Sequence, residues 1–162
     1  MGKLVKGIWV DWIDKVKILQ KAVIQNNEGK LLALLRPEKE YARPNCWDLC
    51  GGSVDFEDVE RWKSKSGKGD NDDILIKGIK REALEEIGLK VKNPQVVHVS
   101  SGYNTKKGVY IIAIGYLCKL DGNYAVKLSK EHVDYKWVTK QEFLRLNVGD
   151  DGGLIKSIVK KC

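Results

Sequence analysis

The sequence lacks the long apolar segments that mark membrane proteins. No apolar run in its 162 residues approaches the roughly 18 residues that a membrane-spanning helix needs. Residues 1–6 also provide no signal-peptide core before Asp11. These absences predict a cytoplasmic protein with no membrane partner.

The four cysteines lack the paired spacing of a zinc site. They are Cys46, Cys50, Cys118 and Cys162. Because intracellular thiols are normally kept reduced, we expect all four to be free thiols with no role as metal ligands.

The chain also lacks internal repeats and linker-like stretches. Its length suits one domain with a sizeable core. Hydrophobic residues at 43% and charged residues at 31% are typical of a globular protein. We therefore expect a single domain over residues 1–162.

No motif that combines basic and aromatic residues accompanies the net charge of +7. The lysines are spread from Lys3 to Lys161. A basic surface attracts polyanions, which include nucleotides and RNA. We favour a simple solubility trait as the explanation, because no such motif is present, and keep RNA as a possible partner without a specific signal.

Apolar periodicity predicts an α+β fold. Alternating or continuous apolar runs, separated by turns, predict strands over residues 16–25, 30–36, 47–54, 95–102, 108–120 and 134–138. Three- and four-residue apolar spacing, together with capping residues, predicts helices over residues 72–87, 139–146 and 154–161. Residues 4–13 fit either a strand or a helix.

Three glutamates cluster in the first of these helices. Glu82, Glu85 and Glu86 stand at i, i+3 and i+4, so they share one helix face. Their mutual repulsion would be relieved by a divalent cation, and carboxylate oxygens suit Mg²⁺ or Mn²⁺. Arg81 lies four residues before Glu85 and can orient a glutamate. An ordinary solvated acidic face is the alternative for the cluster taken alone.

The sequence around this cluster resembles the Nudix box. Residues 81–89, Arg-Glu-Ala-Leu-Glu-Glu-Ile-Gly-Leu, match the second half of that pattern at every fixed position. Residues 47–54, Trp-Asp-Leu-Cys-Gly-Gly-Ser-Val, resemble the lead-in to its first half, with Cys50 where proline is usual. The box glycine would be Gly52.

The two halves lie farther apart than the box allows. Counting forward from Gly52 places the box glutamate at Asp58, whereas counting back from Arg81 places it at Asp73. The lysine- and glycine-rich residues 57–70 therefore predict an inserted surface loop. We favour Asp73 as the box acid, because Asn71 and Asp72 provide helix-capping chemistry just before it.

The resemblance implies an αβα Nudix sandwich, with a mixed sheet between helices, and an enzyme that hydrolyses nucleoside diphosphate derivatives. It assigns Glu82, Glu85 and Glu86 as ligands of Mg²⁺ or Mn²⁺. We favour Glu85 as the residue that helps to activate water, with Arg81 orienting a glutamate.

Other residues complete the expected site. Glu131 is the candidate for a remote carboxylate, because residues 131–138 resemble the glutamate-then-tryptophan segment late in many Nudix chains. His132 is either an alternative base or a surface residue. Gly51 and Gly52 would bring the backbone close to phosphate or metal, and Tyr103 would stack on a base.

Subfamily marks are missing downstream of the box. The proline of ADP-ribose enzymes is replaced by residues 104–105, Asn-Thr, and the tyrosine of dinucleoside polyphosphate enzymes by residues 106–107, Lys-Lys. The default substrate is therefore a (deoxy)nucleoside triphosphate. The alternatives are nucleotide sugars such as ADP-ribose, dinucleoside polyphosphates and RNA 5′ ends, or a nucleotide-sensing module that is not an enzyme. Nudix proteins commonly form homodimers, but no residue here predicts an interface.

Overall fold

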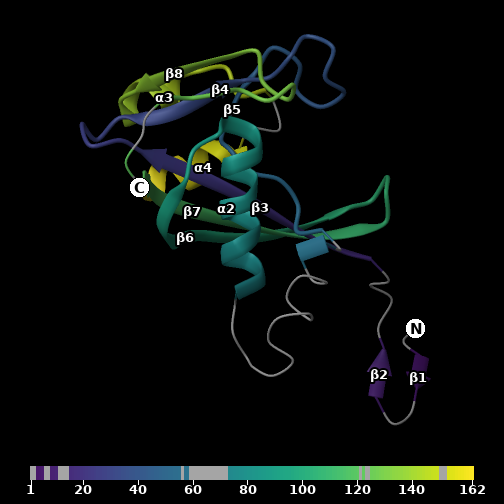
Figure 1. Cartoon of the computed structure of the whole chain (residues 1–162). Helices are drawn as coiled ribbons and strands as arrows, with labels where there is room; N and C mark the ends of the chain where they lie inside the picture. Colours follow the sequence, from purple (N-terminus) through teal and green to yellow (C-terminus); the bar gives the residue numbers. More distant parts are fainter. Residues whose placement is uncertain are drawn as a thin grey trace.

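The structure is a computed structural model of the whole chain (Figure 1). It describes residues 3–5, 8–10, 15–55, 57–58, 73–120, 122, 125–149 and 153–162; residues 3–5, 8–10 and 73 are described for the backbone only.

One mixed sheet of six strands forms the centre of the molecule. The strands are β3 (Val16–Gln25), β4 (Leu31–Leu35), β5 (Trp47–Asp48), β6 (Val91–Asn104), β7 (Val109–Leu120) and β8 (Asp134–Val138). Their order is β5-β4-β3-β7-β6, with β8 also paired to β4. β3 and β7 run parallel, whereas the other pairs are antiparallel. The almost wholly apolar β7 lies between two strands, as its sequence predicts.

Helices cover both faces of this sheet, because β3 and β4 alternate their side chains between two cores. Ala22 and Ile24 of β3 pack on one face, where α2 (Asp73–Ile87) contributes Ile79, Ala83 and Ile87. Val23 points to the opposite face, which α3 (Lys140–Arg145) and α4 (Gly153–Lys161) cover. Figure 1 shows α2 in front of the sheet and α4 behind it. The predicted αβα sandwich is confirmed.

Local signals in the sequence set several element ends. The helix predicted over residues 139–146 begins with a capping box, in which Thr139 and Glu142 satisfy each other's backbone N–H. Strand β6 starts at Val91, four residues earlier than predicted, because the ladder passes residues 93–94 with a bulge. Asn93 has a positive φ of 49° there, a conformation that asparagine tolerates.

The ambiguous N-terminal segment forms strands. β1 (Lys3–Val5) and β2 (Ile8–Val10) pair antiparallel as a separate two-stranded sheet. Within the described residues, no helix is long and apolar enough to cross a membrane.

The segment that contains the glycine pair lies alongside β3. Ala22 N–H donates to the Cys50 carbonyl at 2.8 Å, and Gln20 N–H donates to the Gly52 carbonyl at 2.8 Å. These bonds fix the bend at residues 51–52 beside the middle of β3, on the edge opposite β7.

Candidate active site

The glycine bend brings backbone and carboxylates together in a way that side chains at these positions would prevent. Gly51 has φ of +129°, and a Cβ there would collide with the Gln20 carbonyl. A Cβ on Gly52 would lie 2.7 Å from a carboxylate oxygen of Glu82. The Glu82 carboxylate therefore rests directly on the bend.

Glu86 contacts the same bend from one turn further along α2. Its Oε2 accepts a hydrogen bond of 3.1 Å from Gly51 N–H, and the Cys50 thiol also donates to its carboxylate. The residue is only 3% exposed. Burial raises the pKa of Glu86 to about 7, although Lys21, the Gly51 N–H and the Cys50 thiol act in the opposite direction.

Glu82 is less buried, and neighbouring charges act on it with opposite signs. Burial raises the pKa of Glu82, while Arg81, whose Nη2 lies 3.0 Å from its Oε1, lowers it. The charges of Glu85 and Glu131 raise it further. The charge of the exposed Glu131, the candidate remote carboxylate, therefore acts on Glu82 without a direct contact between them.

Arg81 is fixed by an aspartate other than the one the sequence favoured. Its Nε donates to Oδ1 of Asp58 at 2.9 Å, and its Nη2 donates to Oδ2 at 2.9 Å. Asp58 is 6% exposed. Asp73 instead marks the start of α2. The bidentate pair with Arg81 favours Asp58, six positions after Gly52, over Asp73 as the box acid.

The predicted loop at residues 57–70 lies mostly outside the described residues. Its first two residues are helical, and Asp58 is buried. These two residues therefore do not belong to an exposed loop.

Glu85 takes a different position from the other two glutamates. It accepts a hydrogen bond of 2.8 Å from Arg81 Nη1, and its side chain is 57% exposed. Among the described residues, no group of three or more His, Cys, Asp or Glu side chains converges closely enough to hold a metal ion. The structure brings Glu82 and Glu86 onto the bend and leaves Glu85 beside Arg81.

His132 is buried next to Glu86, which corrects its interpretation as a surface residue. It is 6% exposed, and its Nδ1 has no hydrogen-bond partner. That nitrogen lies 4.0 Å from Glu86 Oε2. Burial lowers the pKa of His132 to about 4, so the ring is neutral at physiological pH.

A buried ion cluster behind the bend was not predicted. The fully buried Asp48 binds Lys21, Arg36 and Arg43. Burial alone would raise the pKa of Asp48, but the charges of Lys21 and Arg43 hold it below its ordinary value of 3.8. Lys21 Nζ also donates to the Gly51 carbonyl at 3.0 Å. One sequence signal marks this cluster: Lys21 is charged but directly precedes the apolar run Ala22-Val23-Ile24 of β3.

The donor chemistry of the bend fits a divalent cation. Burial raises the pKa of both Glu82 and Glu86, and the charge of Glu82 raises the pKa of Glu86 further. No lysine or arginine of the described ranges forms an ion pair with Glu86. A hard cation would offset this repulsion, and the unpaired Nδ1 of His132 marks a polar group without a partner in the same place.

Tyr103 lies elsewhere, at the end of β6. It is opposite Tyr110 in the β6–β7 hairpin and half exposed. The predicted role of Tyr103 in substrate binding therefore concerns the hairpin tip and not the glycine bend.

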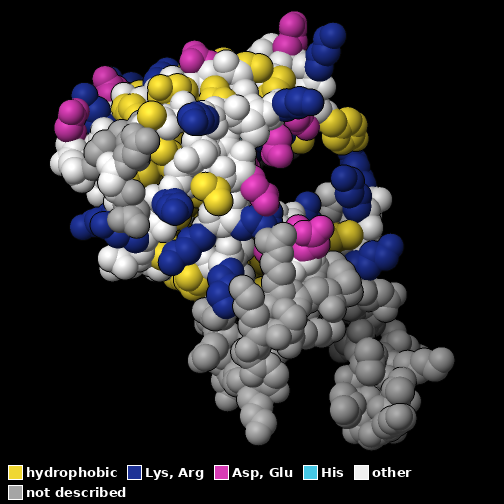
Figure 2. All heavy atoms as spheres, in the orientation of Figure 1, with side chains coloured by type: hydrophobic (Ala, Val, Ile, Leu, Met, Phe, Trp, Pro, Cys, Tyr) yellow, Lys and Arg dark blue, Asp and Glu magenta, His cyan; other side chains and the backbone are white. Residues whose placement is uncertain are grey.

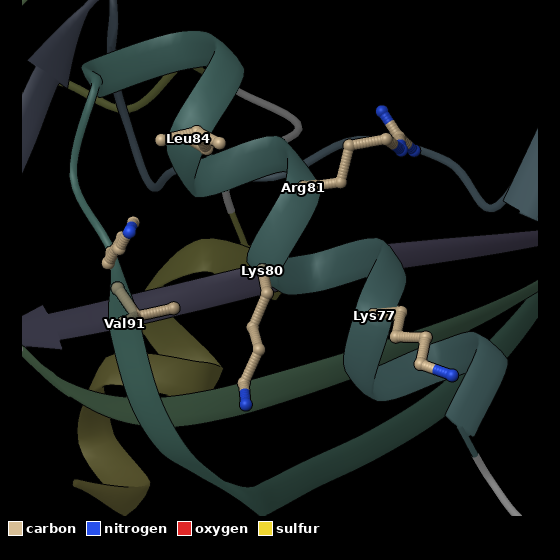
Figure 3. Close-up of a pocket in the computed structure, with 6 residues that line it drawn as sticks. Lys77, Lys80, Arg81, Leu84 and Val91 are labelled. Atoms are coloured by element: carbon tan, nitrogen blue, oxygen red, sulfur yellow. The ribbon is translucent and has the colours of Figure 1, made fainter.

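A cavity of about 400 Å³ lies along α2 (Figure 3). It is lined by Lys77, Lys80, Arg81, Leu84, Lys90 and Val91. Figure 3 shows Arg81 leaving the helix in a different direction from Lys80 and Leu84. Since this cavity contains neither the bend nor the acidic pair, we do not assign the chemistry to it.

Comparisons with known proteins identify the family. The family model of the NUDIX domain matches residues 20–157, which is most of the chain. The chain therefore belongs to the Nudix family. The family and the fold together support an enzyme, a Nudix hydrolase, as the sequence predicted.

Solved structures share this fold at low sequence identity. The MutT protein from Methanosarcina mazei Go1 is 24% identical with a TM-score of 0.65, covering 93% of this chain and 94% of its own. The MutT NUDIX hydrolase from Burkholderia pseudomallei is 20% identical with a TM-score of 0.62, covering 91% and 98%. The NUDIX domain of Shewanella oneidensis NrtR, solved with ADP ribose, is 13% identical with a TM-score of 0.63, covering 92% and 88%. A search of curated proteins found no match.

Proposed function

We propose that the protein is a divalent-metal-dependent pyrophosphohydrolase of (deoxy)nucleoside triphosphates. Water attacks a phosphorus atom of the phosphate chain, a phosphoanhydride bond breaks, and a nucleoside monophosphate and pyrophosphate leave. The observation that supports this proposal is the placement of Glu82 and Glu86 on the glycine bend, where both carboxylates are desolvated.

The main requirement of phosphoryl transfer is charge neutralisation around an in-line nucleophile. Mg²⁺ or Mn²⁺, when bound, would neutralise charge on the phosphate oxygens and acidify water. Glu82 and Glu86 would hold it, because their oxygens converge on the bend. Gly51 N–H fixes the orientation of Glu86, since it donates to Oε2.

Arg81 organises the remaining carboxylates. Its guanidinium is held by Asp58 and reaches Glu82 at 3.0 Å and Glu85 at 2.8 Å. Glu85 is exposed enough to meet a water molecule, which suits the role of proton acceptor. Glu131 acts on Glu82 through its charge and would complete the acidic site.

The test is release of phosphate or pyrophosphate across a panel of nucleoside triphosphates, with Mg²⁺ and with Mn²⁺. We expect Glu85→Gln to lower kcat by roughly a hundredfold or more, as for loss of a base or ligand. Glu28→Gln is the matched control, because Glu28 is an exposed glutamate that pairs only with nearby Lys30 in the turn before β4. Equal rates for the wild type and Glu85→Gln would reject this role for Glu85.

A second candidate is hydrolysis of ADP-ribose or another nucleotide sugar, because the NrtR domain was solved with ADP ribose. The net charge of +7 keeps RNA 5′ ends as a further alternative. The same panel, extended to ADP-ribose, dinucleoside polyphosphates and a 5′-triphosphate RNA, separates these substrates. RNA binding without salt dependence would exclude the RNA version. A nucleotide that binds without any turnover would indicate a sensing module.

A further inference from the structure

We infer that Tyr41 and Lys107 form a clamp that holds the nucleobase end of the substrate. This inference rests on the proposed function and goes beyond it, because it names the surface that recognises the part of the substrate that does not react. The ligand class is an aromatic base attached to a polyphosphate.

The two residues come from segments that face each other across an opening. Tyr41 lies in the loop between β4 and β5, and Lys107 lies at the tip of the β6–β7 hairpin. Lys107 Nζ is 6.0 Å from the centre of the Tyr41 ring, which is the range of a cation–π contact. In the orientation of Figure 1, Figure 2 shows a deep opening on this side of the molecule, with Asp and Glu side chains among those on its rim.

Tyr41 is displayed by a loop that is fixed on both sides of it. The Tyr41 residue is 93% exposed, although large aromatic groups usually gain stability from burial. Arg36 Nε donates to the Ala42 carbonyl at 2.8 Å, and Arg36 also pairs with Glu40 at 3.4 Å. Arg43, with a positive φ of 52°, binds the buried Asp48. The loop thus accepts backbone strain and still leaves its aromatic ring in solvent.

The turn that carries Lys107, on the other side of the clamp, is also fixed by hydrogen bonds. Lys107 N–H donates to the carbonyl and to Oδ1 of Asn104, at 3.2 and 3.0 Å. The Tyr103 hydroxyl lies next to Gly108, 3.8 Å from where a Cβ would stand. Tyr103 therefore provides a second ring, which is half exposed, next to the residue that follows Lys107.

A chain of ion pairs and hydrogen bonds links the Tyr41 loop to the glycine bend. Arg36 and Arg43 bind Asp48, Asp48 binds Lys21 at 3.1 Å, and Lys21 donates to the Gly51 carbonyl. The spacing between Tyr41 and the glycine bend is therefore set by buried ion pairs. A substrate with a base at one end and a phosphate chain at the other has groups for both sides of the clamp, since bases stack on tyrosine and amines attract phosphate.

The test separates recognition of the base from recognition of the phosphates. Dissociation constants are measured by calorimetry for a nucleoside monophosphate, and inhibition constants for inorganic triphosphate, which has no base. Tyr41→Leu keeps an apolar side chain but removes the ring, and it is expected to weaken nucleotide binding about tenfold. Tyr41→Phe keeps the ring and should bind within about twofold of the wild type. Inorganic triphosphate should inhibit all three proteins equally.

Lys107→Met supplies the second variant, with Lys106→Met as its control in the same turn. Both remove one positive charge, but only Lys107 contacts Tyr41. We expect a severalfold weaker affinity for the nucleotide in Lys107→Met and a smaller change in Lys106→Met. Circular dichroism and Tm of each variant show whether folding is intact.

The outcomes distinguish this inference from the proposed function. If the wild type hydrolyses nucleoside triphosphates but Tyr41→Leu binds nucleotide as tightly as the wild type, Tyr41 does not hold the nucleobase. The inference is then wrong, whereas the hydrolase proposal stands. If no nucleotide is hydrolysed, the proposed function fails, and the binding series alone decides whether Tyr41 recognises a base. Equal weakening of nucleotide and inorganic triphosphate by Tyr41→Leu would also overturn the clamp.

Discussion

Two buried carboxylates flank the glycine bend, and the protein surrounds them in opposite ways. Asp48 is enclosed by three basic side chains, from Lys21, Arg36 and Arg43, and its pKa is lowered. Glu86 is almost as buried, but its near neighbours are an N–H group, a thiol and a neutral imidazole, and its pKa is raised to about 7. Among the residues that the structure describes, Asp48 forms direct ion pairs with basic side chains, whereas Glu86 is influenced by a basic residue, Lys21, only through its charge.

In the proposed site, this difference distinguishes Asp48 as a structural carboxylate from Glu86 as a cation ligand. A buried charge is tolerated when it is paired and hydrogen-bonded, which Asp48 satisfies completely. No lysine or arginine of the described ranges forms an ion pair with Glu86, which is the arrangement that the proposed cation site requires. The four predictions that follow test this contrast.

The largest effect is expected on stability from Asp48→Asn. The substitution removes the shared partner of three cations, two of which fix the loop that carries Tyr41. Breaking a buried pair from one side costs about 3–5 kcal/mol. Urea unfolding measures this loss, and a change below about 1 kcal/mol would show that the cluster does not support the fold.

Glu86→Gln should lower activity strongly and leave stability intact, whereas Asp48→Asn should lower stability. We expect kcat/KM to fall by roughly a hundredfold or more, because a ligand is lost, while the metal-free protein is at least as stable as the wild type at pH 8. The gain arises because a buried, uncompensated charge is removed. Steady-state kinetics and thermal unfolding of the same preparation check both parts; a strongly destabilised Glu86→Gln would make Glu86 a second structural carboxylate.

The third prediction concerns the pH dependence of stability without metal. The pKa of Glu86 is raised from an ordinary 4.5 to about 7. The stabilisation that protonated Glu86 gives to the folded state is therefore fully present below pH 4.5 and is lost as the pH rises to 7. The free energy of unfolding falls there by at most about 1.4 kcal/mol per pH unit. Glu86→Gln should lack this falling limb in urea titrations.

His132 should change the pH dependence of stability in the direction opposite to Glu86, in the same experiment. Its pKa is lowered from an ordinary 6.5 to about 4, so stability is lost as the pH falls from 6.5 to 4. His132→Gln should remove that limb and leave the Glu86 limb in place. Identical pH profiles for the wild type and Glu86→Gln would contradict the assignment.

The smallest effect separates the two candidates for the box acid. Asp58→Asn weakens the bidentate support of Arg81 and should lower kcat/KM about tenfold, as loss of a supporting partner commonly does. Asp73→Asn, at the start of α2, should change it less than about twofold. The opposite ranking would restore Asp73 as the box acid.

Local sequence signals predicted most of the fold. The limits of β3 are those expected from the apolar run over residues 16–25, and α2 follows the apolar spacing of Ile79, Ala83 and Ile87. The capping box at Thr139 was also visible in the sequence. These features depend on neighbours within a few positions, so periodicity and capping rules suffice to find them.

Contacts between residues far apart in the sequence could not be predicted from periodicity and capping rules. The pairing of Arg81 with Asp58 joins residues 23 positions apart, so spacing alone gave two candidates, and capping chemistry favoured Asp73 over the aspartate that binds Arg81. The Asp48 cluster joins β3, β5 and the loop after β4, and His132 is buried only because the segment before β8 passes Glu86. Such contacts depend on tertiary packing, which no local pattern encodes.

The most direct test of the account is Mn²⁺ binding to the wild type and to Glu86→Gln, measured by calorimetry at pH 8 in the absence of nucleotide. The account predicts that the wild type binds Mn²⁺ and that Glu86→Gln binds it at least about tenfold more weakly, within the 10–100-fold range typical of lost metal-site support. Equal binding by the two proteins, or no binding by the wild type, would contradict the claim that the bend and its acidic pair form a cation site.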